Sequence, residues 1–121
     1  MELNEYQKQA MTTCTKTSEN FAYMMLNLAG EVGELAGKVA KAIRKSEATF
    51  FTGGELRQPS TRRICDELEG AMRKEAGDVL WQLSGLCSVM GWELDGIARE
   101  NLEKLASRKE RGVIVGDGDN R

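Results

Sequence analysis

Two acidic pairs are the residues in this sequence that are best placed to do chemistry. Glu31 and Glu34 lie in the segment GEVGE, and Glu75 and Asp78 lie in the segment EAGD. Each pair has i, i+3 spacing, which projects two carboxylates from one side of a helix. At about 100° per residue, Glu31 and Glu75 border the apolar stripes of their helices. We therefore expect the two pairs to face each other across a helix–helix contact.

Converging carboxylates repel one another unless something neutralises them. Two like charges about 4 Å apart repel by roughly 4 kcal/mol at an effective dielectric constant of 20, so four such groups either take up protons or bind a cation. Oxygen ligands favour a hard divalent ion, so we expect Mg²⁺, with Mn²⁺ as a substitute. The alternative is that the acids are solvated helix residues, since the chain has 19 Asp and Glu. In that case Glu34 pairs with Lys38 at i, i+4.

Hydrogen-bond donors accompany the acids in two rows along the sequence. In the first row Asn27, Glu31 and Glu34 are followed by three lysines on the same helix face, so the row runs from acid to base. The second row has spacings of three or four residues near the C-terminus. Such donors suit phosphate oxygens. The candidate phosphate-binding residues are Lys38, Lys41, Lys45, Asn101, Lys104, Arg108 and Arg111.

The composition excludes several classes of site. The chain has no histidine, which removes Ser-His-Asp and Cys-His nucleophiles and every zinc site with a His ligand. Its three cysteines show no CxxC spacing and are interpreted as free thiols. The net charge of −2 predicts no nucleic-acid partner. No apolar run is long enough for a membrane span, and the first residues lack the pattern of a signal peptide, so we expect a cytoplasmic protein without a membrane partner.

The residues that carry these groups must lie on long helices. The chain of 121 residues has a single proline, Pro59, which lies between two segments of 3.6-residue periodicity. Asn4 and Gln7 have capping-box spacing for a first helix, and Ser18 or Asn20 would cap the second. The helices are expected over residues 4–17, 19–46, 62–90 and 92–109. The fold class is therefore all-α, with a four-helix bundle-like protomer completed by dimer or tetramer packing.

The second expected helix has a well-defined apolar stripe. Three glycines, Gly30, Gly33 and Gly37, lie on a different sector and predict close approach of another helix. Helices of about 28 residues are roughly 40 Å long, more than a chain with few aromatics can cover alone, so we expect a homodimer or homotetramer. The stripe, which is expected to form the core, consists of Phe21, Met25, Leu28, Val32, Leu35, Val39 and Ile43.

Three aromatic residues are candidate base contacts. Phe50 and Phe51 lie in the inter-helix loop expected at 46–62, and they either anchor the loop or form a shelf for a flat ligand. Trp81 follows Asp78 by about one turn and either packs in the core or contacts a base or sugar.

The C-terminal segment 110–121 is expected to be a mobile tail. It is rich in Gly and Asp and also carries Arg111 and Arg121. Its charged residues either order over a ligand or stay disordered.

Three segments together resemble a known family. In order they are LAGEVGELAGKVAKAIRK, KEAGDVLWQL and NLEKLASRKERGVIVGDGDNR, and they are similar to the MazG-like members of the all-α nucleoside triphosphate pyrophosphohydrolase superfamily. The resemblance covers nearly the whole chain and implies a single MazG-like domain over 1–121. It implies an oligomeric helical enzyme that uses Mg²⁺ to split a nucleoside triphosphate between its α- and β-phosphates. The stretch from Ser46 to Arg62 departs from the pattern, which leaves base recognition open.

The resemblance also assigns roles to individual positions. Asn101 and Lys104 match residues that in similar proteins lie near the phosphates. The matching acids, which are the candidate catalytic residues and metal ligands, are Glu31, Glu34, Glu75 and Asp78. Of these, Glu75 either ligates the metal or accepts the proton from the attacking water.

Other functions remain open at this stage. One is a non-enzymatic helical interaction module, in which the acids are solvated and the glycines serve subunit packing. Another is a narrower enzyme, such as a dUTP or dCTP hydrolase or a phosphoribosyl-ATP hydrolase. The broad activity would fit a role in cleansing the nucleotide pool.

Overall fold

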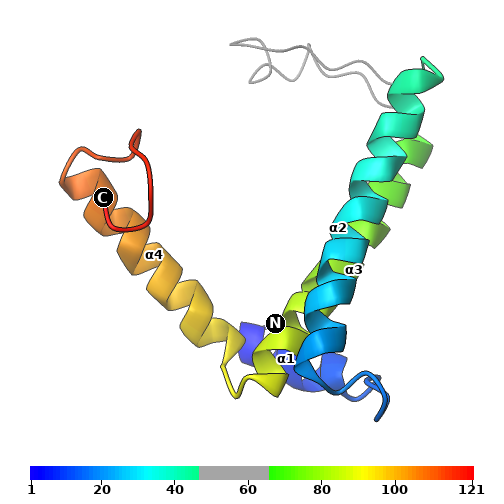
Figure 1. Cartoon of the computed structure of the whole chain (residues 1–121), viewed down its shortest axis with the longest axis horizontal. Helices are drawn as coiled ribbons and strands as arrows, with labels where there is room; N and C mark the ends of the chain where they lie inside the picture. The colour runs from blue at the N-terminus through cyan, green and yellow to red at the C-terminus, as the bar shows by residue number, and fades with distance from the viewer. Residues whose placement is uncertain (47–65) are drawn as a thin grey trace.

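The computed structural model describes residues 1–46 and 66–121, and the regular structure in these ranges is helical (Figure 1). Its helices are α1 (Leu3–Met11), α2 (Phe21–Arg44), α3 (Asp66–Val89) and α4 (Leu94–Glu110). The all-α prediction with four helices is confirmed. The inter-helix loop expected at 46–62 lies almost entirely outside the described residues. Within them, no helix has both the length and the apolar character that crossing a membrane requires.

The helices form an open V (Figure 1). In one arm α2 and α3 run side by side in opposite directions, and α1 packs against α3 at the base. The other arm is α4, which contacts α1 and points away from the α2–α3 pair. Within a single chain the four helices therefore do not close into a bundle. Its completion by other subunits stays a prediction.

Helix α1 joins the two arms through two amide side chains. The expected capping box on α1 is wrong, because α1 begins without a side-chain cap. Instead, Gln7 Oε1 accepts a hydrogen bond from Leu94 N (2.8 Å), and Asn4 Oδ1 accepts one from Asp95 N (2.9 Å). The first backbone N–H groups of a helix have no partner within it, so α1 supplies the acceptors that α4 needs. Gln7 Nε2 also donates to Trp92 O (2.9 Å) in the turn between α3 and α4.

The ends of α1 and α2 follow local chemistry. Helix α1 stops at Met11, well short of the expected Thr17. The hydroxyls of Thr12 and Thr13 donate to main-chain oxygens one turn back, at distances of 2.6 and 2.7 Å, which is typical of side chains that end a helix. The prediction of an Asn20 cap is confirmed, since Asn20 Oδ1 accepts from the backbone N–H three residues later at 2.8 Å.

The apolar stripe of α2 is only partly covered. Met24 and Ala42 are the buried residues of this helix. By contrast, Phe21, Val32 and Ile43 remain 55%, 49% and 51% exposed. Among the described helices, α2 makes its main contact with α3, which covers one flank of the stripe and leaves the other open. The prediction that the whole stripe is core is therefore wrong for the single chain.

The close approach of helices depends on a glycine of α3. A Cβ added at Gly85 would meet the Sδ of Met24 and lie 2.6 Å from its Cε. Gly33 and Gly37 of α2 were expected to have this role, but a Cβ at either position would meet no described atom within 4 Å. Within the single chain the glycine prediction is thus wrong for these two positions, while an approach by a helix of another subunit stays a prediction. Gly85 lets Met24 lie fully buried between α2 and α3.

We predict that Gly85→Ala is less stable than Gly77→Ala by about 1–3 kcal/mol, because both substitutions gain helix propensity but only at Gly85 must the end of the Met24 side chain move in a packed contact. The matched control is Gly77→Ala on the same helix, where an added Cβ meets nothing within 4 Å. That variant should gain up to about 1 kcal/mol from helix propensity. Urea denaturation followed by circular dichroism measures both. Equal stability of the two variants would contradict the close contact.

Candidate metal and phosphate site

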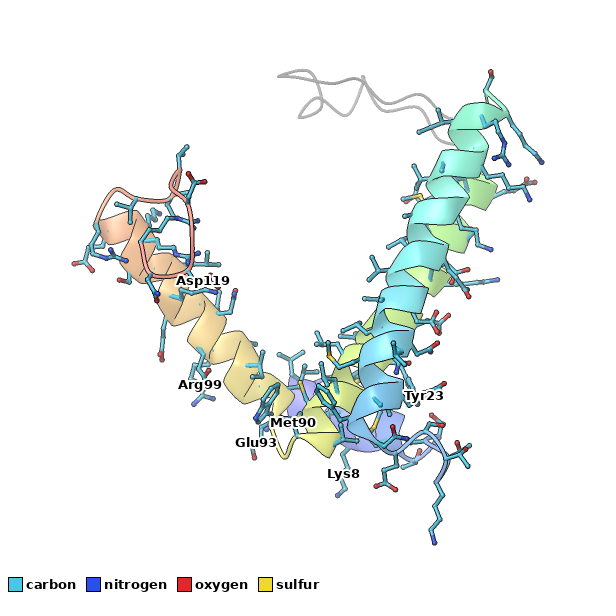
Figure 2. The ribbon with its side chains drawn as sticks, in the orientation of Figure 1. Lys8, Tyr23, Met90, Glu93, Arg99 and Asp119 are labelled. Carbon is cyan, nitrogen blue, oxygen red and sulfur yellow. The ribbon has the colours of Figure 1, made fainter. Side chains whose placement is uncertain are left out.

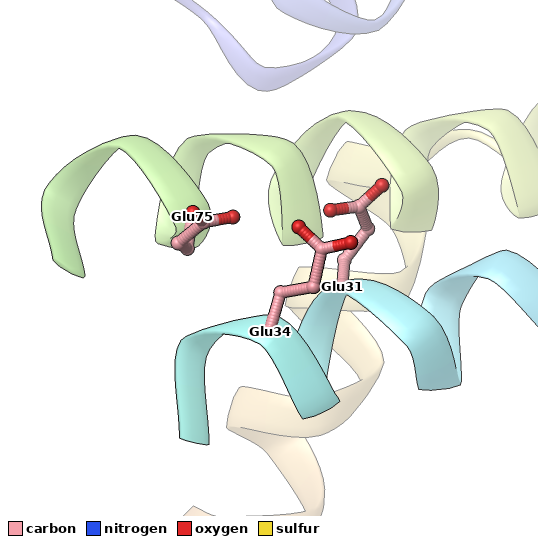
Figure 3. A group of neighbouring side chains, drawn as sticks. All are labelled: Glu31, Glu34 and Glu75. Atoms are coloured by element: carbon pink, nitrogen blue, oxygen red, sulfur yellow. The ribbon is translucent and has the colours of Figure 1, made fainter. Parts of the chain in front are cut away.

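The structure brings three of the four predicted acids together (Figure 3). Glu31 and Glu34 of α2 and Glu75 of α3 each offer a carboxylate oxygen, and these atoms lie within 4.8 Å of one another. Glu31 and Glu75 are half-buried at the helix–helix contact, while Glu34 is exposed. Three oxygens this close, with one carboxylate open to solvent, form a donor set that suits a hard divalent cation.

A buried chain of amides orients Glu31. Asn27 Nδ2 donates to Glu31 Oε1 and to Gln82 Oε1, both at 3.0 Å. Gln82 is almost fully buried, and its Nε2 donates to Met24 O at 3.4 Å. Gln82 was missed in the sequence analysis. Its signal is the spacing of seven residues from Glu75, which places both on nearly the same face of α3.

Lys38 partly neutralises the acidic group. Its Nζ lies 3.2 Å from Glu75 Oε1, with the Lys38 side chain 46% exposed and that of Glu75 12% exposed. The helical pairing of Lys38 with Glu34 considered from the sequence is replaced by a pair across α2 and α3. The predicted phosphate ligand Lys38 therefore lies beside the acids and has a carboxylate partner.

Asp78 lies apart from the other three acids. It is exposed, and it is absent from the group of neighbouring carboxylates. Burial raises the pKa of the Tyr6 phenol, and the charge of Asp78 raises that pKa further, which indicates that Asp78 faces α1. At about 100° per residue, Asp78 is rotated by roughly 60° from Glu75 around α3. In this chain the fourth expected ligand thus points toward a different neighbour.

The second donor row is engaged by the C-terminal tail. Asp119 Oδ1 lies 3.0 Å from Arg108 Nη2 and 3.5 Å from Lys104 Nζ. Arg111 Nη2 donates to the main-chain oxygen of Arg121 at 2.7 Å. These contacts fold the tail back along α4, on the arm of the V opposite the acids (Figure 1). The two predicted donor rows therefore do not meet within one chain, and the mobility expected for the tail stays a prediction.

The other predicted phosphate contacts are exposed. Lys41 and Lys45 lie at the C-terminal end of α2, where Lys45 is the capping residue. Asn101 lies on the exposed surface of α4.

The aromatic predictions have different outcomes. Trp81 Nε1 donates to Ala10 O (3.0 Å) and to Thr13 Oγ1 (2.9 Å), so its ring is held against α1. This geometry favours the packing interpretation over a base contact. Phe50 and Phe51 lie outside the described residues.

A separate cavity of about 730 Å³ lies at the base of the V. It is lined by residues of α1, of the α1–α2 connection (Cys14 and Glu19) and of the α3–α4 turn (including Trp92), together with Met24 of α2, and by none of the four acids. Burial and the neighbouring Glu19 raise the pKa of the Cys14 thiol, so it stays protonated near neutral pH and is a poor nucleophile. The cavity therefore adds no reactive group to the acidic site.

Comparison with known proteins shows the family to which the chain belongs. Residues 19–113 match the MazG nucleotide pyrophosphohydrolase domain, and this range includes all four acids and the whole of α4. The chain belongs to the MazG family. The resemblance seen in the sequence is thereby confirmed. A similar protein is the Gene 37 protein of Mycobacterium phage L5, with 37% identity over 103 residues that cover 85% of this chain and 78% of the phage protein. No solved structure matches.

Membership of the MazG family places the acidic group in a chemical context. The family is one of nucleotide pyrophosphohydrolases, and its enzymes generally use divalent metal ions. Glu31, Glu34 and Glu75 bring carboxylate oxygens within 4.8 Å of one another inside the MazG domain, a donor set that suits such an ion.

We predict that Lys38→Gln increases the affinity for Mg²⁺ or Mn²⁺ without nucleotide, because the ammonium group competes with the metal for Glu75. The pair is partly exposed, so the gain is about 0.2–1 kcal/mol, or up to about fivefold. The control Lys41→Gln makes the same change in net charge one turn further along α2. Isothermal titration with each metal measures both variants. An equal gain in the two would show that net charge alone is responsible.

Proposed function

We propose that this protein hydrolyses a nucleoside triphosphate between its α- and β-phosphates, giving a nucleoside monophosphate and pyrophosphate. The observation that carries the proposal is the group of carboxylate oxygens from Glu31, Glu34 and Glu75 within 4.8 Å of one another. Membership of the MazG family supports the reaction class. The three carboxylates alone would fit any hard cation. Membership of the MazG family is what supports a nucleotide as the ligand of that cation.

In this proposal Glu31, Glu34 and Glu75 hold Mg²⁺, and Mn²⁺ is a substitute of similar chemistry. When bound, the ion neutralises phosphate oxygens and lowers the pKa of a coordinated water. The hydrogen bond from Asn27 fixes the carboxylate of Glu31, so this ligand needs no reorientation. Glu34 is exposed and is therefore the acid most accessible to an incoming ligand.

Glu75 and Lys38 have linked roles in the proposal. Glu75 either ligates the metal or accepts the proton of the attacking water. Its carboxylate is held by Lys38 in the free chain. With a cation held at Glu75, the Lys38 ammonium would be free to contact a phosphate oxygen. In this proposal the positive charge of Lys38 neutralises the acidic group in the free protein and the phosphate of the substrate in the complex.

The remaining sequence-derived contacts are part of the proposal. Asp78 matches the ExxD motif and is proposed as a fourth ligand, which requires its exposed side chain to turn away from α1. Asp78→Asn tests this role separately from the three clustered acids. The proposed phosphate contacts are Lys41, Lys45, Asn101, Lys104, Arg108 and Arg111.

The substrate range is addressed by one assay. Release of pyrophosphate measured across all canonical and modified nucleoside triphosphates distinguishes a broad enzyme from a dUTP, dCTP or phosphoribosyl-ATP hydrolase. A broad range supports a cytoplasmic role in cleansing the nucleotide pool. Absence of metal-dependent nucleotide binding would instead favour the helical interaction module.

We predict that Glu34→Gln lowers kcat by more than about 100-fold, beyond the 10–100-fold typical of losses outside the ligand set. The reason is that an amide keeps the shape of the side chain but removes the charge that binds the metal. Glu69→Gln, at an exposed position of α3 outside the acidic group, is the matched control and should keep full activity. Circular dichroism and light scattering check that helical content and oligomeric state are unchanged. Full activity of Glu34→Gln would refute the assignment.

We also propose that the chain self-associates as a homodimer or homotetramer through the open flank of α2. The half-exposed side chains of Phe21, Val32 and Ile43 form an apolar surface that is costly to leave in water. Association through such a surface would complete the bundle that one chain leaves open.

Accordingly, Val32→Asp should shift the mass measured by size-exclusion chromatography with light scattering toward the monomer, because a carboxylate would be buried in the interface. Lys41→Asp, on the opposite face of α2, is the control and should leave the mass unchanged. A monomeric wild-type chain at high micromolar concentration would contradict self-association.

A further inference from the structure

Arg108 has an unusual environment for a residue at the end of α4. Its side chain is only 6% exposed. Its Nη2 contacts Asp119 Oδ1 and Asp119 O, both at 3.0 Å, and Gly118 O at 3.4 Å. The Nε atom is buried and has no hydrogen-bond partner among the described residues. A buried guanidinium with an unused donor lowers stability unless another acceptor reaches it.

The acceptor that holds Arg108 is largely exposed to solvent. The Asp119 side chain is 84% exposed, although it contacts both Arg108 and Lys104. Figure 2 shows Asp119 on the tail where it lies against α4. The Arg108 guanidinium and the Lys104 ammonium lower the pKa of this carboxyl group, so it is ionised at neutral pH. The basic pair thus binds an oxyanion that belongs to the chain itself.

The backbone of the tail explains how the carboxylate reaches this position. Gly118 has a φ of +77°, in the left-handed region that side chains disfavour, and Gly112 begins the tail with a φ of +68°. The two glycines allow the chain to reverse and return Asp119 to α4. Of the two partners, the Asp119 side chain is exposed to solvent and the Arg108 side chain is buried.

We propose that Asp119 is an internal competitor, whose carboxylate occupies the Lys104–Arg108 pair and is exchanged for the phosphate oxygens of a ligand. A phosphoryl group offers more acceptor oxygens than a carboxylate, enough to engage Lys104, the Arg108 Nη2 and the unused Arg108 Nε together. The choice of pyrophosphate as the ligand rests on the proposed function, in which it is the product. The tail is therefore an autoinhibitory segment of the α4 anion site.

The test is isothermal titration of the full chain with inorganic pyrophosphate in buffer without divalent metal. Asp119→Asn should bind pyrophosphate at least about fivefold more tightly than wild type, because the apparent affinity of an occupied site is reduced by the fraction that is open. The matched control is Asp117→Asn, which removes the same charge from the same tail. Within the described chain Asp117 forms no ion pair with Lys104 or Arg108, so its variant should bind like wild type.

Two further measurements make the test decisive. Lys104→Gln in the Asp119→Asn background should lose the gain, and Lys104 is exposed enough to be replaced without disturbing the fold. The amide resonance of Gly118 should move on addition of pyrophosphate to wild type toward its position in Asp119→Asn. Equal affinities of the Asp117 and Asp119 variants, or no binding to either, would overturn the proposal. Because the assay contains no metal, its result does not depend on whether the three acids bind a metal ion. Likewise, a negative result here would not contradict metal binding by those acids.

Discussion

The site depends on the register in which α2 and α3 run past each other. Met24 lies against Gly85, and three residues further along α2 Asn27 bonds to Gln82, three residues back along α3. Another seven residues in each direction reach Glu34 and Glu75. One close contact and one buried amide pair therefore bring acids of the two helices to the same level. A shift by one residue would rotate one set of acids by about 100° and separate the carboxylates.

The same register explains which acids converge. Glu31 and Asp78 also lie at the same position along the paired helices. For two carboxylates to converge, however, both must also point toward the contact between the helices. Glu31 lies on the half-buried side of α2, one turn after Asn27, whose side chain donates a hydrogen bond to its carboxylate. Asp78 is rotated away from Glu75 toward Tyr6, so α1 becomes its electrostatic neighbour. The residue spacing fixes both the position of an acid along the helix axis and its direction around that axis. The packing of α1 then determines which helix each acid lies near.

The features predictable from the sequence are those that a helix determines by itself. Periodicity gave four helices, and Asn20 capped α2 because its partner is three residues away. Asn4 and Gln7 had the same local pattern, yet they bind α4, whose unpaired N–H groups compete for the same side-chain oxygens. Similarly, the apolar stripe of α2 could be read from the sequence, but how much of it is buried depends on the number of helices that pack against it. Long-range partners and the burial they cause cannot be deduced from one chain's spacing.

Charge is distributed over the V in a way that suits a metal-bound phosphate ligand. The α2–α3 arm carries three clustered carboxylates, and the α4 arm carries a cationic pair. Each group has an internal counter-charge, Lys38 on the first arm and Asp119 on the second, and both counter-charges are substantially exposed. In each pair one partner is exposed and the other is largely buried, so a ligand that replaces the exposed counter-charge must supply an equivalent charge to the buried partner. Under the proposed function a metal ion would displace Lys38 and a phosphate would displace Asp119, so each internal counter-charge would be exchanged for one part of the ligand.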